Sequence, residues 1–455
     1  MRFYLILAFM AHVHRVHSST LCDSDLCVCK QNKSENDDIG EVVDCSYFPA
    51  ILKTNYSLPS AVFSLDLSWN NLTSVNATPI LQSSTLTALY LNNNKITEIA
   101  IDALQLPQLK RLDLSNNYLE AIQKDTFQNI HNLEYLNLAN NKFHSLSELS
   151  FHHLSNLNEI ILDNNNLGPS LKSKNLFDRN GYGLTNKIRS LSISGINLRS
   201  VYDNFFVDAY NIRRLIISNN NLTEIFELPF TLEYLDLSDN PITEISGEDF
   251  SEMPALKELK LNNLWIEEVP AYTFAFLPGL TSLQLERNKN LTTFSELAFG
   301  QEILEDADDF ALENLSVRGS RLSTLSDKLE VPFGHLIHLD LQGNLWKCDC
   351  NLKWIKRLQI SNKESSHLRC YTPHVLYNSK LMEISEKYLV CQVKQHYVGV
   401  TIGVVTACVL LTAIAAWIFL YVPKNPAKFI FLKDMNMSTA GYSALPVHMG
   451  FRDAP

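Results

Sequence analysis

Eight of the nine cysteines fall into two groups near the ends of the chain, on either side of a long region that has none. The first group is Cys22, Cys27, Cys29 and Cys45, and the second is Cys348, Cys350, Cys370 and Cys391. Thiols at such short spacings support two kinds of chemistry, because they oxidise to disulfides or, as thiolates, bind zinc. The compartment in which the chain folds decides between the two.

The first 18 residues have the pattern of a secretory signal peptide. Arg2 precedes the apolar run from Phe3 to Ala11, and Ser18 is a small residue at a suitable cleavage position. Three nearby histidines are removed with this peptide: His12, His14 and His17. We therefore expect an oxidising compartment, disulfides rather than zinc, and no metal site, while the spacing alone leaves three pairings open in each group.

Residues arranged for catalysis are missing from the sequence. It contains no HExxH, no GxSxG and no glycine-rich phosphate loop, and His152 and His153 fall on a polar turn after Phe151. The net charge of -11 with neutral histidines argues against binding to a phosphate backbone. We expect neither an enzyme nor a cofactor-binding protein, and no nucleic-acid partner.

Seven N-x-S/T sequons lie between the two cysteine groups or within them. They begin at Asn32, Asn55, Asn71, Asn76, Asn221, Asn290 and Asn314. Such sequons accept N-glycans in secreted chains, so the ectodomain is expected to be a glycoprotein. Asn314 differs from the others because its glycan would lie on or beside the inner wall of the repeat region described next.

The region between the cysteine groups repeats the phrase LxxLxLxxNxL about every two dozen residues. Clear copies begin at Val62, Leu86, Leu109, Leu133, Leu157, Ile212 and Leu232, and weaker ones at Ile188, Leu256, Leu280, Leu312 and Leu336. The LxL core is a short strand whose leucines point inward, and stacked copies form one parallel sheet. Twelve copies predict an α/β solenoid, a leucine-rich-repeat horseshoe with a parallel concave sheet.

Two further columns accompany the leucines. A buried asparagine after each strand satisfies backbone groups where the chain turns, and this ladder is interrupted where Ile196, Leu264 or Ser320 replaces asparagine. A phenylalanine falls eighteen residues after the start of several repeats and is expected to fill the core from the convex side: Phe127, Phe151, Phe206, Phe230, Phe250 and Phe274.

The second cysteine group carries a more specific resemblance. The run from Asn344 to Trp354, NLWKCDCNLKW, resembles the C-terminal cap of extracellular leucine-rich-repeat proteins, although Leu345 stands where that family usually has proline. In similar proteins the first cysteine of a cap joins the third and the second joins the fourth. The resemblance therefore implies the pairs Cys22 with Cys29, Cys27 with Cys45, Cys348 with Cys370, and Cys350 with Cys391.

After the second cap, residues 397–422 contain no charged side chain and are long enough to span a bilayer as a helix. Lys424, Lys428 and Lys433 follow, which predicts a cytosolic tail. The tail, residues 423–455, is too short for a folded signalling domain. Tyr442 and Leu445 match the tyrosine-plus-apolar pattern of endocytic sorting signals in similar membrane proteins, a pattern that is also common by chance.

Two longer repeats carry charged insertions, one near Gly168 to Lys187 with Lys174, and one near Gly300 to Phe310 with Asp306. Solvated loops often carry such charges, yet long loops on a rigid scaffold also commonly bind ligands.

The outward positions beside the inward leucines hold several apolar residues in repeats where polar ones are usual. They are Tyr90, Tyr135, Ile161, Ile216 and Tyr234, and Arg111, Glu159, Arg213 and Arg214 would form a charged border. Tyrosine and arginine carry much of the energy of protein interfaces, so this band on the concave wall is a candidate ligand site. The alternative is that Ile161 and Ile216 reflect only the β propensity of isoleucine.

These patterns predict six segments: signal peptide 1–18, N-terminal cysteine-rich cap 19–61, leucine-rich repeats 62–345, C-terminal cap and stalk 346–396, transmembrane helix 397–422 and cytoplasmic tail 423–455. The whole resembles Toll-like receptor ectodomains and leucine-rich adhesion proteins, without a cytoplasmic Toll-type domain. We expect a plasma-membrane, single-pass type I glycoprotein with its N-terminus extracellular. Its function would be that of a receptor subunit or co-receptor for a protein ligand or partner ectodomain, signalling through that partner as a homo- or hetero-oligomer. The alternative function is cell adhesion by self-association.

Overall fold

The computed structural model describes residues 21–24, 26–33, 39–48, 51–53, 56–173, 176–177, 182, 184, 187–201, 205–391 and 396–421. The predicted signal peptide, Asn55, and Tyr442 and Leu445 of the tail lie outside the described residues. The chain divides into two units, Met1–Val390 and Cys391–Pro455, and each is considered by itself.

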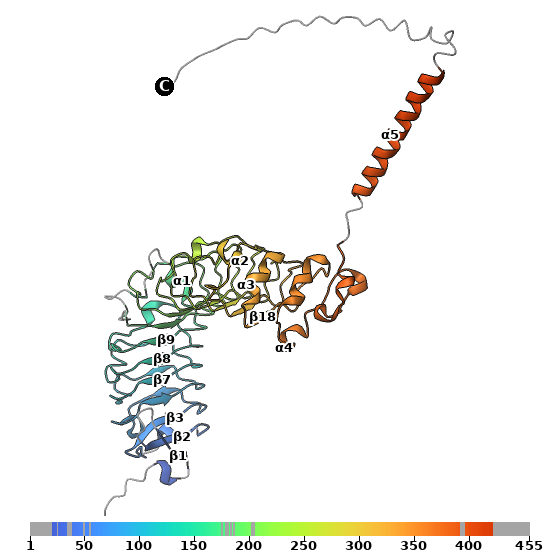
Figure 1. The fold of residues 1–455 in the computed structure, drawn as a ribbon. Coiled ribbons are helices and arrows are strands. Elements are labelled where there is room, and N and C mark those ends of the chain that lie inside the picture. The colour runs from blue at the N-terminus through green and yellow to red at the C-terminus, as the bar shows by residue number, and fades with distance from the viewer. Residues whose placement is uncertain are drawn as a thin grey trace, which may run out of the picture. The chain divides into compact units, whose positions relative to one another are not determined.

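A single sheet runs through the first unit (Figure 1). In spatial order its strands are β1 (Val28–Lys33), β2 (Ile39–Asp44), β3 (Val62–Asp66), β5 (Ala88–Tyr90), β7 (Arg111–Asp113), β8 (Tyr135–Asn137), β9 (Glu159–Ile161), β10 (Ser190–Ser192), β11 (Arg214–Ile216), β12 (Tyr234–Asp236), β13 (Glu258–Lys260), β15 (Ser282–Gln284), β17 (Asn314–Ser316) and β18 (His338–Asp340). The twelve strands from β3 onward are parallel, one for each copy of the repeat, which confirms the predicted solenoid.

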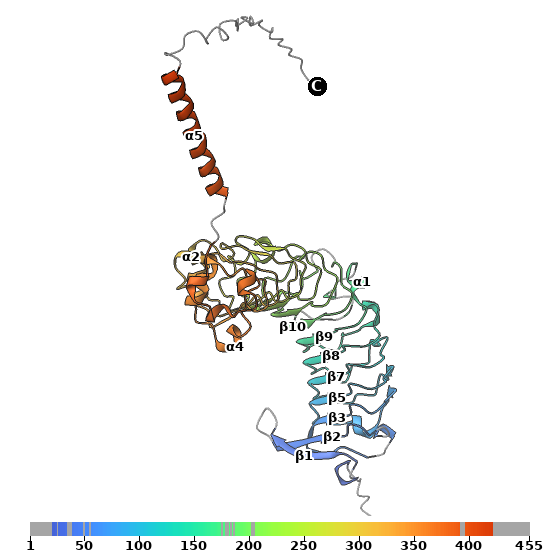
Figure 2. The same ribbon diagram turned by 90° about the vertical axis from the view of Figure 1, so that its right-hand side faces the viewer.

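The strands pair in an unshifted register. Figure 2 shows β3 to β10 lying side by side in this order. The central residue of each of the eleven three-residue strands from β5 onward is a buried leucine or isoleucine, as Leu112, Leu136 and Ile160 illustrate, each with no exposed surface, and Leu65 takes this place in β3. Its two neighbours point to the opposite face because side chains alternate along a strand. One line of apolar side chains therefore enters the core, and two lines of outward residues cover the sheet surface.

The remaining elements are short and lie mostly on the returning segments. Two small parallel sheets pair β4 (Ser74–Val75) with β6 (Glu98–Ile99), and β14 (Glu268–Val269) with β16 (Thr293–Phe294). The α-helices of this unit are α1 (Gly168–Leu171), α2 (Glu302–Glu305), α3 (Glu330–Gly334) and α4 (Asn362–Ser365). The 3-10 helices are η1 (Leu21–Ser24), η2 (Ile51–Lys53), η3 (Pro79–Leu81), η4 (Leu146–Glu148), η5 (Glu248–Phe250), η6 (Asp327–Leu329), η7 (Cys350–Arg357), η8 (His374–Leu376), η9 (Leu381–Glu383) and η10 (Glu386–Tyr388).

The predicted asparagine ladder is present and links neighbouring repeats. In nine repeats a buried asparagine amide donates one hydrogen bond to a carbonyl of its own repeat and one to a carbonyl of the preceding repeat or cap, at 2.9 to 3.2 Å: Asn70, Asn94, Asn117, Asn141, Asn165, Asn220, Asn240, Asn288 and Asn344. Ile196, Leu264 and Ser320 are buried at the equivalent places and interrupt it. Ser320 still donates a hydrogen bond from its hydroxyl to the Leu285 carbonyl at 3.3 Å.

The residue before each ladder position adopts a left-handed backbone conformation in all twelve repeats. Most of these residues are the types that tolerate a positive φ: Asn93, Asn116, Asn140, Asn164, Gly195, Asn219, Asp239, Asn263, Gly319 and Gly343. Trp69, with a φ of 60°, and Arg287, with a φ of 57°, are the exceptions. This turn explains why asparagine so often occurs twice in succession in the sequence.

The phenylalanine column is confirmed at five of its six predicted positions. Phe127, Phe151, Phe206, Phe250 and Phe274 are buried, and the rings of Phe250 and Phe274 lie 6.1 Å apart. The prediction for Phe230 is wrong, because 58% of this residue is exposed. The repeat that begins at Ile212 is only twenty residues long, so the residue eighteen positions after Ile212 lies past the convex side. The ring of Phe226 stacks on that of Phe206 instead, with the centroids 6.1 Å apart.

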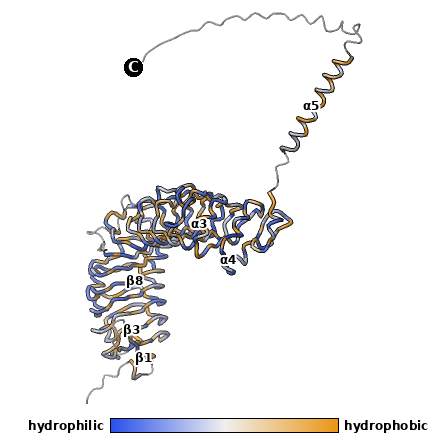
Figure 3. The backbone as a smooth tube through the Cα atoms, in the orientation of Figure 1, coloured by the Kyte–Doolittle hydropathy of each residue, from blue (hydrophilic) through white to orange (hydrophobic). Residues whose placement is uncertain are grey.

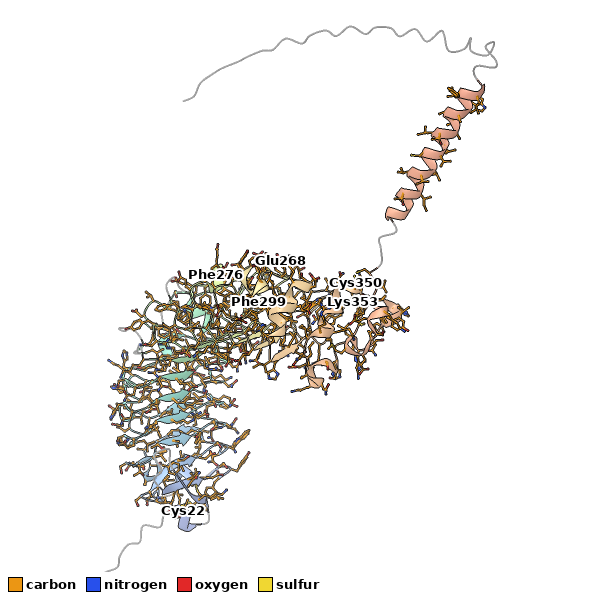
Figure 4. The ribbon with its side chains drawn as sticks, in the orientation of Figure 1. Cys22, Glu268, Phe276, Phe299, Cys350 and Lys353 are labelled. Atoms are coloured by element: carbon orange, nitrogen blue, oxygen red, sulfur yellow. A yellow bond between two sulfur atoms is a disulfide. The ribbon has the colours of Figure 1, made fainter. Side chains whose placement is uncertain are left out.

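Both ends of the solenoid are covered. Cys22 is bonded to Cys29 and Cys27 to Cys45, and β2 of this cap pairs with β3, so the sheet continues into the cap. At the other end Cys348 is bonded to Cys370, while Trp346 and Trp354 are buried. Figure 4 labels Cys22 and Cys350 at the two ends of this unit. Cys350 and Cys391 are each disulfide-bonded, and their pairing with one another stays a prediction.

The second unit contains helix α5 (His396–Tyr421). Within it, residues Thr401–Leu420 form a segment that is long and apolar enough to cross a membrane. Figure 3 shows the hydrophobic colour along most of this helix. The cysteine in its middle, Cys408, is a free thiol.

Candidate binding surface

The unshifted register places the outward side chains in two straight columns on the sheet surface. The first column contains, from β7 to β13, Arg111, Tyr135, Glu159, Ser190, Arg214, Tyr234 and Glu258. The order arginine, tyrosine, glutamate therefore occurs twice, with a serine strand between the two occurrences. We name Arg111, Tyr135 and Glu159 the first triad, and Arg214, Tyr234 and Glu258 the second triad.

The arginine and tyrosine of each triad stack in the same way. The guanidinium carbon of Arg111 lies 3.5 Å from the centroid of the Tyr135 ring, and that of Arg214 lies 3.6 Å from the centroid of the Tyr234 ring. A guanidinium stacked at this distance is attracted by the negative face of the ring and is held flat against it. Its N–H groups then point sideways, where they are available to a carboxylate or carbonyl oxygen of a ligand.

Burial differs along each triad. Both arginines are exposed, Tyr135 is half-buried, and Tyr234 is 9% exposed because Lys260 also lies over its ring, with the ammonium 5.4 Å from the centroid. Burial raises the pKa of the Tyr135 hydroxyl, although the positive charge of Arg111 opposes the shift. Tyr135 therefore remains neutral at physiological pH and serves as a π surface and a hydroxyl hydrogen-bonding group.

The second column contains the predicted isoleucines. From β5 to β13 it reads Tyr90, Asp113, Asn137, Ile161, Ser192, Ile216, Asp236 and Lys260. Ile161 and Ile216 are half-buried and are separated by the buried Ser192, whose hydroxyl donates a 2.7 Å hydrogen bond to Asp163. Tyr90 stands apart from them beside Asp113. The predicted apolar and aromatic residues therefore lie on this surface with charged and polar groups between them as well as along their border.

Arg213 lies one residue before β11, outside both columns. Its guanidinium donates a hydrogen bond to the Thr231 carbonyl at 3.2 Å. The same edge of the sheet carries the exposed ion pairs Lys110–Glu134, at 3.4 Å, and Lys257–Glu233, at 2.8 Å. The hydrogen bond from Lys257 lowers the pKa of the Glu233 carboxyl. Exposed pairs of this kind contribute little to stability, so this edge mainly sets the local charge.

Glu258 is the residue that sequence reasoning missed. A signal was present, because the dipeptides Lys110–Arg111, Glu134–Tyr135 and Asn158–Glu159 in three consecutive repeats are matched by Arg213–Arg214, Glu233–Tyr234 and Lys257–Glu258. The sequence analysis selected apolar outward residues and so missed this pattern, because most residues of the repeated dipeptides are charged.

Five sequon asparagines are exposed: Asn32, Asn71, Asn76, Asn221 and Asn290. Asn314 is half-buried in the first outward column, two strands beyond Glu258, and its amide donates a hydrogen bond to the Thr281 carbonyl at 3.4 Å. A glycan on Asn314 would thus occupy the sheet surface itself, next to the second triad.

The charged insertions contribute no residue to the triads. In the first, Lys172 is exposed and Lys187 donates a hydrogen bond to the Asn156 side chain at 3.4 Å, whereas Lys174 and Arg179 lie outside the described residues. The second borders a cavity of about 580 Å³ whose lining includes Phe276, Phe299 and Glu302. Figure 4 labels these two phenylalanines.

The surface and fold together define an extracellular-type leucine-rich-repeat protein, a class that binds other molecules without catalysing reactions. The family description "Leucine rich repeat" matches residues 107–167 and 211–263, and "Leucine Rich repeats (2 copies)" matches residues 84–129. Tsukushi of Gallus gallus is 32% identical over 296 residues, which span 62% of this chain and 68% of Tsukushi. The chain belongs to the leucine-rich-repeat family, whose members related to it are non-enzymatic binding proteins.

Other relatives match over smaller parts of their length. Podocan of Mus musculus is 34% identical over 250 residues, 53% of this chain and 35% of podocan, and nephrocan of Mus musculus is 30% identical over 156 residues, 31% of this chain and 30% of nephrocan. Among solved structures, the TLR13-ssRNA13 complex aligns with a TM-score of 0.48 at 20% identity, covering 72% of this chain and 54% of TLR13. The leucine-rich-repeat domain of APL1B aligns with a TM-score of 0.47 at 21% identity, covering 66% and 81%.

Proposed function

We propose that this protein is a single-pass cell-surface receptor subunit or co-receptor that binds a protein ligand on its sheet surface and signals through a partner. The observation that carries the proposal is the duplicated triad: two stacked Arg–Tyr pairs, each followed by a glutamate on the next strand, on one face of a rigid sheet.

The chemistry of a triad specifies what it binds. Reading across the strands, it offers a cation, an aromatic ring and an anion at spacings of about 4.8 Å. The complementary ligand surface presents a carboxylate, an apolar group and an ammonium or guanidinium group in the same order. Since the triads begin four strands apart, about 19 Å along the sheet, the ligand would make the charged contacts twice. The aromatic contact would be made at the first triad, because Arg214 and Lys260 cover the ring of Tyr234.

The membrane assignment rests on α5 and on the caps. Disulfides support an oxidising compartment, and an apolar helix after the C-terminal cap supports an anchor, with the ectodomain outside and the lysine-containing tail inside. On this assignment the plasma membrane is the site of action, and the tail, which includes Tyr442 and Leu445, would provide sorting rather than catalysis.

Proximity labelling by the full-length protein on live cells tests the proposal. The informative variant is Arg111→Ala with Arg214→Ala, and the matched control is Arg199→Ala with Arg321→Ala, which removes the same charge from exposed arginines outside the strands. We expect a labelled membrane protein to disappear with the triad variant and to remain with the control. Identical labelling by both variants would refute the triads as the binding site.

Cell adhesion by self-association would give a different result. Non-adherent cells that express the protein would aggregate with one another, and the protein on a neighbouring cell would be the main labelled species. That outcome would replace the receptor proposal.

A further inference from the structure

Two bulky aromatic residues occupy left-handed turn positions at the N-terminal end of the solenoid. Trp69 stands where ten of the twelve repeats have asparagine, aspartate or glycine, and Tyr47 occupies the corresponding turn in the cap; each has a φ of 60°. Residues with a Cβ pay a steric cost in this region, and aromatic residues lack the short polar side chain with which asparagine offsets it. A function for the exposed rings would explain why the cost is tolerated.

The two rings form a flat exposed platform. Their centroids are 5.9 Å apart and their planes differ by 9°. Trp69 is 50% exposed and Tyr47 is 71% exposed. Nearly parallel rings at this centroid distance are strongly offset, so Tyr47 leaves much of the indole surface uncovered.

A sequon begins two residues after Trp69, at Asn71-Leu72-Thr73. The intervening Asn70 is buried and fixed, because its amide donates hydrogen bonds to the carbonyls of Leu67 and Cys45 at 3.0 and 2.9 Å. Trp69 and Asn71 lie on either side of this anchored residue and are both exposed. Among the described residues, the Asn71 side chain forms no hydrogen bond that would hold it away from solvent.

We infer that the first N-acetylglucosamine of a glycan on Asn71 packs against the free face of the Trp69 indole. One face of this sugar carries axial C–H groups and is apolar, and its hydrogens are attracted to the electron-rich face of an aromatic ring. The contact would order the glycan and shield the indole, and it would stabilise the left-handed turn in return. This contact does not involve the triads. It rests on the proposed function only in that the ectodomain must pass through the compartment where N-glycans are added.

A second sequon in the chain provides an internal comparison. Asn221-Leu222-Thr223 is the same sequon at the same place in its repeat, directly after the buried ladder residue Asn220. The residue two before it is Asn219, which has a φ of 53° and no aromatic ring. A glycan on Asn221 therefore follows the same buried ladder residue without an aromatic platform, although Asn71 is itself left-handed, with a φ of 52°, and Asn221 is not.

The test compares hydrogen exchange of residues 69–73 and 219–223 in the full-length protein made in glycosylating animal cells. An endoglycosidase that leaves one N-acetylglucosamine should keep the slow exchange of residues 69–73. Asn71→Gln, which removes the whole glycan, should raise it about two- to tenfold, the range for one stacked aromatic contact. Asn221→Gln should leave residues 219–223 unchanged.

A double-mutant comparison isolates the indole. Trp69→Asn installs the residue most repeats use here, so it should fold, and in this background Asn71→Gln should no longer change exchange. The reciprocal variant Asn219→Trp should make residues 219–223 sensitive to Asn221→Gln. Equal sensitivity to the glycan with and without Trp69 would overturn the inference. So would mass spectra with a glycan on Asn221 and none on Asn71, whereas no glycan at any sequon would reject the extracellular topology as well.

Discussion

The side-chain amide nitrogen of Asn141 lies 3.1 Å from the carbonyl oxygen of Leu114, in the preceding repeat. The same amide donates a hydrogen bond to the Leu138 carbonyl at 3.0 Å, and the backbone N–H of Leu119 donates one to its Oδ1 atom at 3.0 Å. One side chain thus satisfies backbone groups of two repeats that the sheet itself leaves unpaired.

Asn141→Ala should therefore reduce stability strongly. The substitution leaves the Leu119 N–H without its acceptor, whereas the Leu114 and Leu138 carbonyls still accept hydrogen bonds from Asn117 and Asn165. A buried backbone group left without a partner costs about 1 to 3 kcal/mol, so we expect a loss of this size in urea denaturation followed by circular dichroism. Asn140→Gly is the control, because Asn140 is exposed and left-handed, a conformation that glycine adopts freely. Comparable losses from both variants would contradict the role of the ladder.

The strand phase is tested in the same repeat. Leu136 has no exposed surface, and Leu136→Ala should cost about 2 to 5 kcal/mol through lost burial and a cavity. Asn137 is half-exposed and accepts a hydrogen bond from the Ala139 N–H at 3.0 Å, so Asn137→Ala should cost about 1 kcal/mol or less. Secretion and melting temperature of the two variants give the comparison, and a reversed order would mean that the faces are exchanged.

Stability should depend on pH through Asp163. Burial raises the pKa of its carboxyl group, although the Ser192 hydroxyl and the Ser194 N–H donate hydrogen bonds that oppose the shift. A carboxyl group with a raised pKa in the folded state binds protons more tightly there, so its ionisation lowers stability as pH rises above about 4, the value in the unfolded chain.

Asp163→Asn should remove this cost and keep an acceptor for both hydrogen bonds. We expect the variant to match or exceed the native chain in melting temperature at pH 7 and to lose its relative advantage toward pH 4. An advantage that grows as the pH falls has the wrong sign and would reject the assignment.

Ligand binding should respond to the second outward column as well as to the triads. Ile161→Asp with Ile216→Asp introduces two charges among groups that a bound ligand would cover, so affinity for the labelled partner should fall by at least tenfold. Normal secretion and melting must accompany the loss. Unchanged affinity in a folded double variant would direct the search to the insertions near Lys174 and Asp306.

Topology has a direct test. A tag after Pro455 should survive protease treatment of intact cells, while the ectodomain shifts in mobility after glycosidase treatment. Helix α5 and the preceding disulfide-stapled cap motivate this expectation. Digestion of the tag on intact cells would show that the chain is oriented otherwise.

The features of the fold that depend on the repeat period could be predicted from the sequence. Twelve strands, the buried leucines and the asparagine ladder follow from spacing, because each repeat forms the same short unit and contacts only its neighbours. Phe230 shows where spacing fails, since a constant offset from Ile212 assumes a constant repeat length. The pairing of β1 with β2 in the N-terminal cap also escaped prediction, because its partners come together through the fold of the cap rather than through the repeat.

The candidate surface was predicted only in part. Its positions follow from strand phase, so Tyr135, Tyr234, Arg111 and Arg214 lie on the expected face. The stacking of each arginine on a tyrosine was not predicted, because it depends on side-chain conformations across neighbouring strands. The position of Ser192 between Ile161 and Ile216 was not predicted either, because the order of residues in a column is known only once every repeat has been aligned.

Because the register is unshifted, the distance between two residues of one outward column is a whole number of inter-strand spacings. Deleting residues 188–211, one complete repeat with β10, would reduce the separation of Arg111 and Arg214 from four strands to three, or from about 19 Å to about 14 Å, and would leave each triad intact. Selectivity for a ligand that contacts both triads is thus encoded by how many repeats stand between them, a property that evolution changes by gaining or losing a unit of sequence rather than by altering any contact residue.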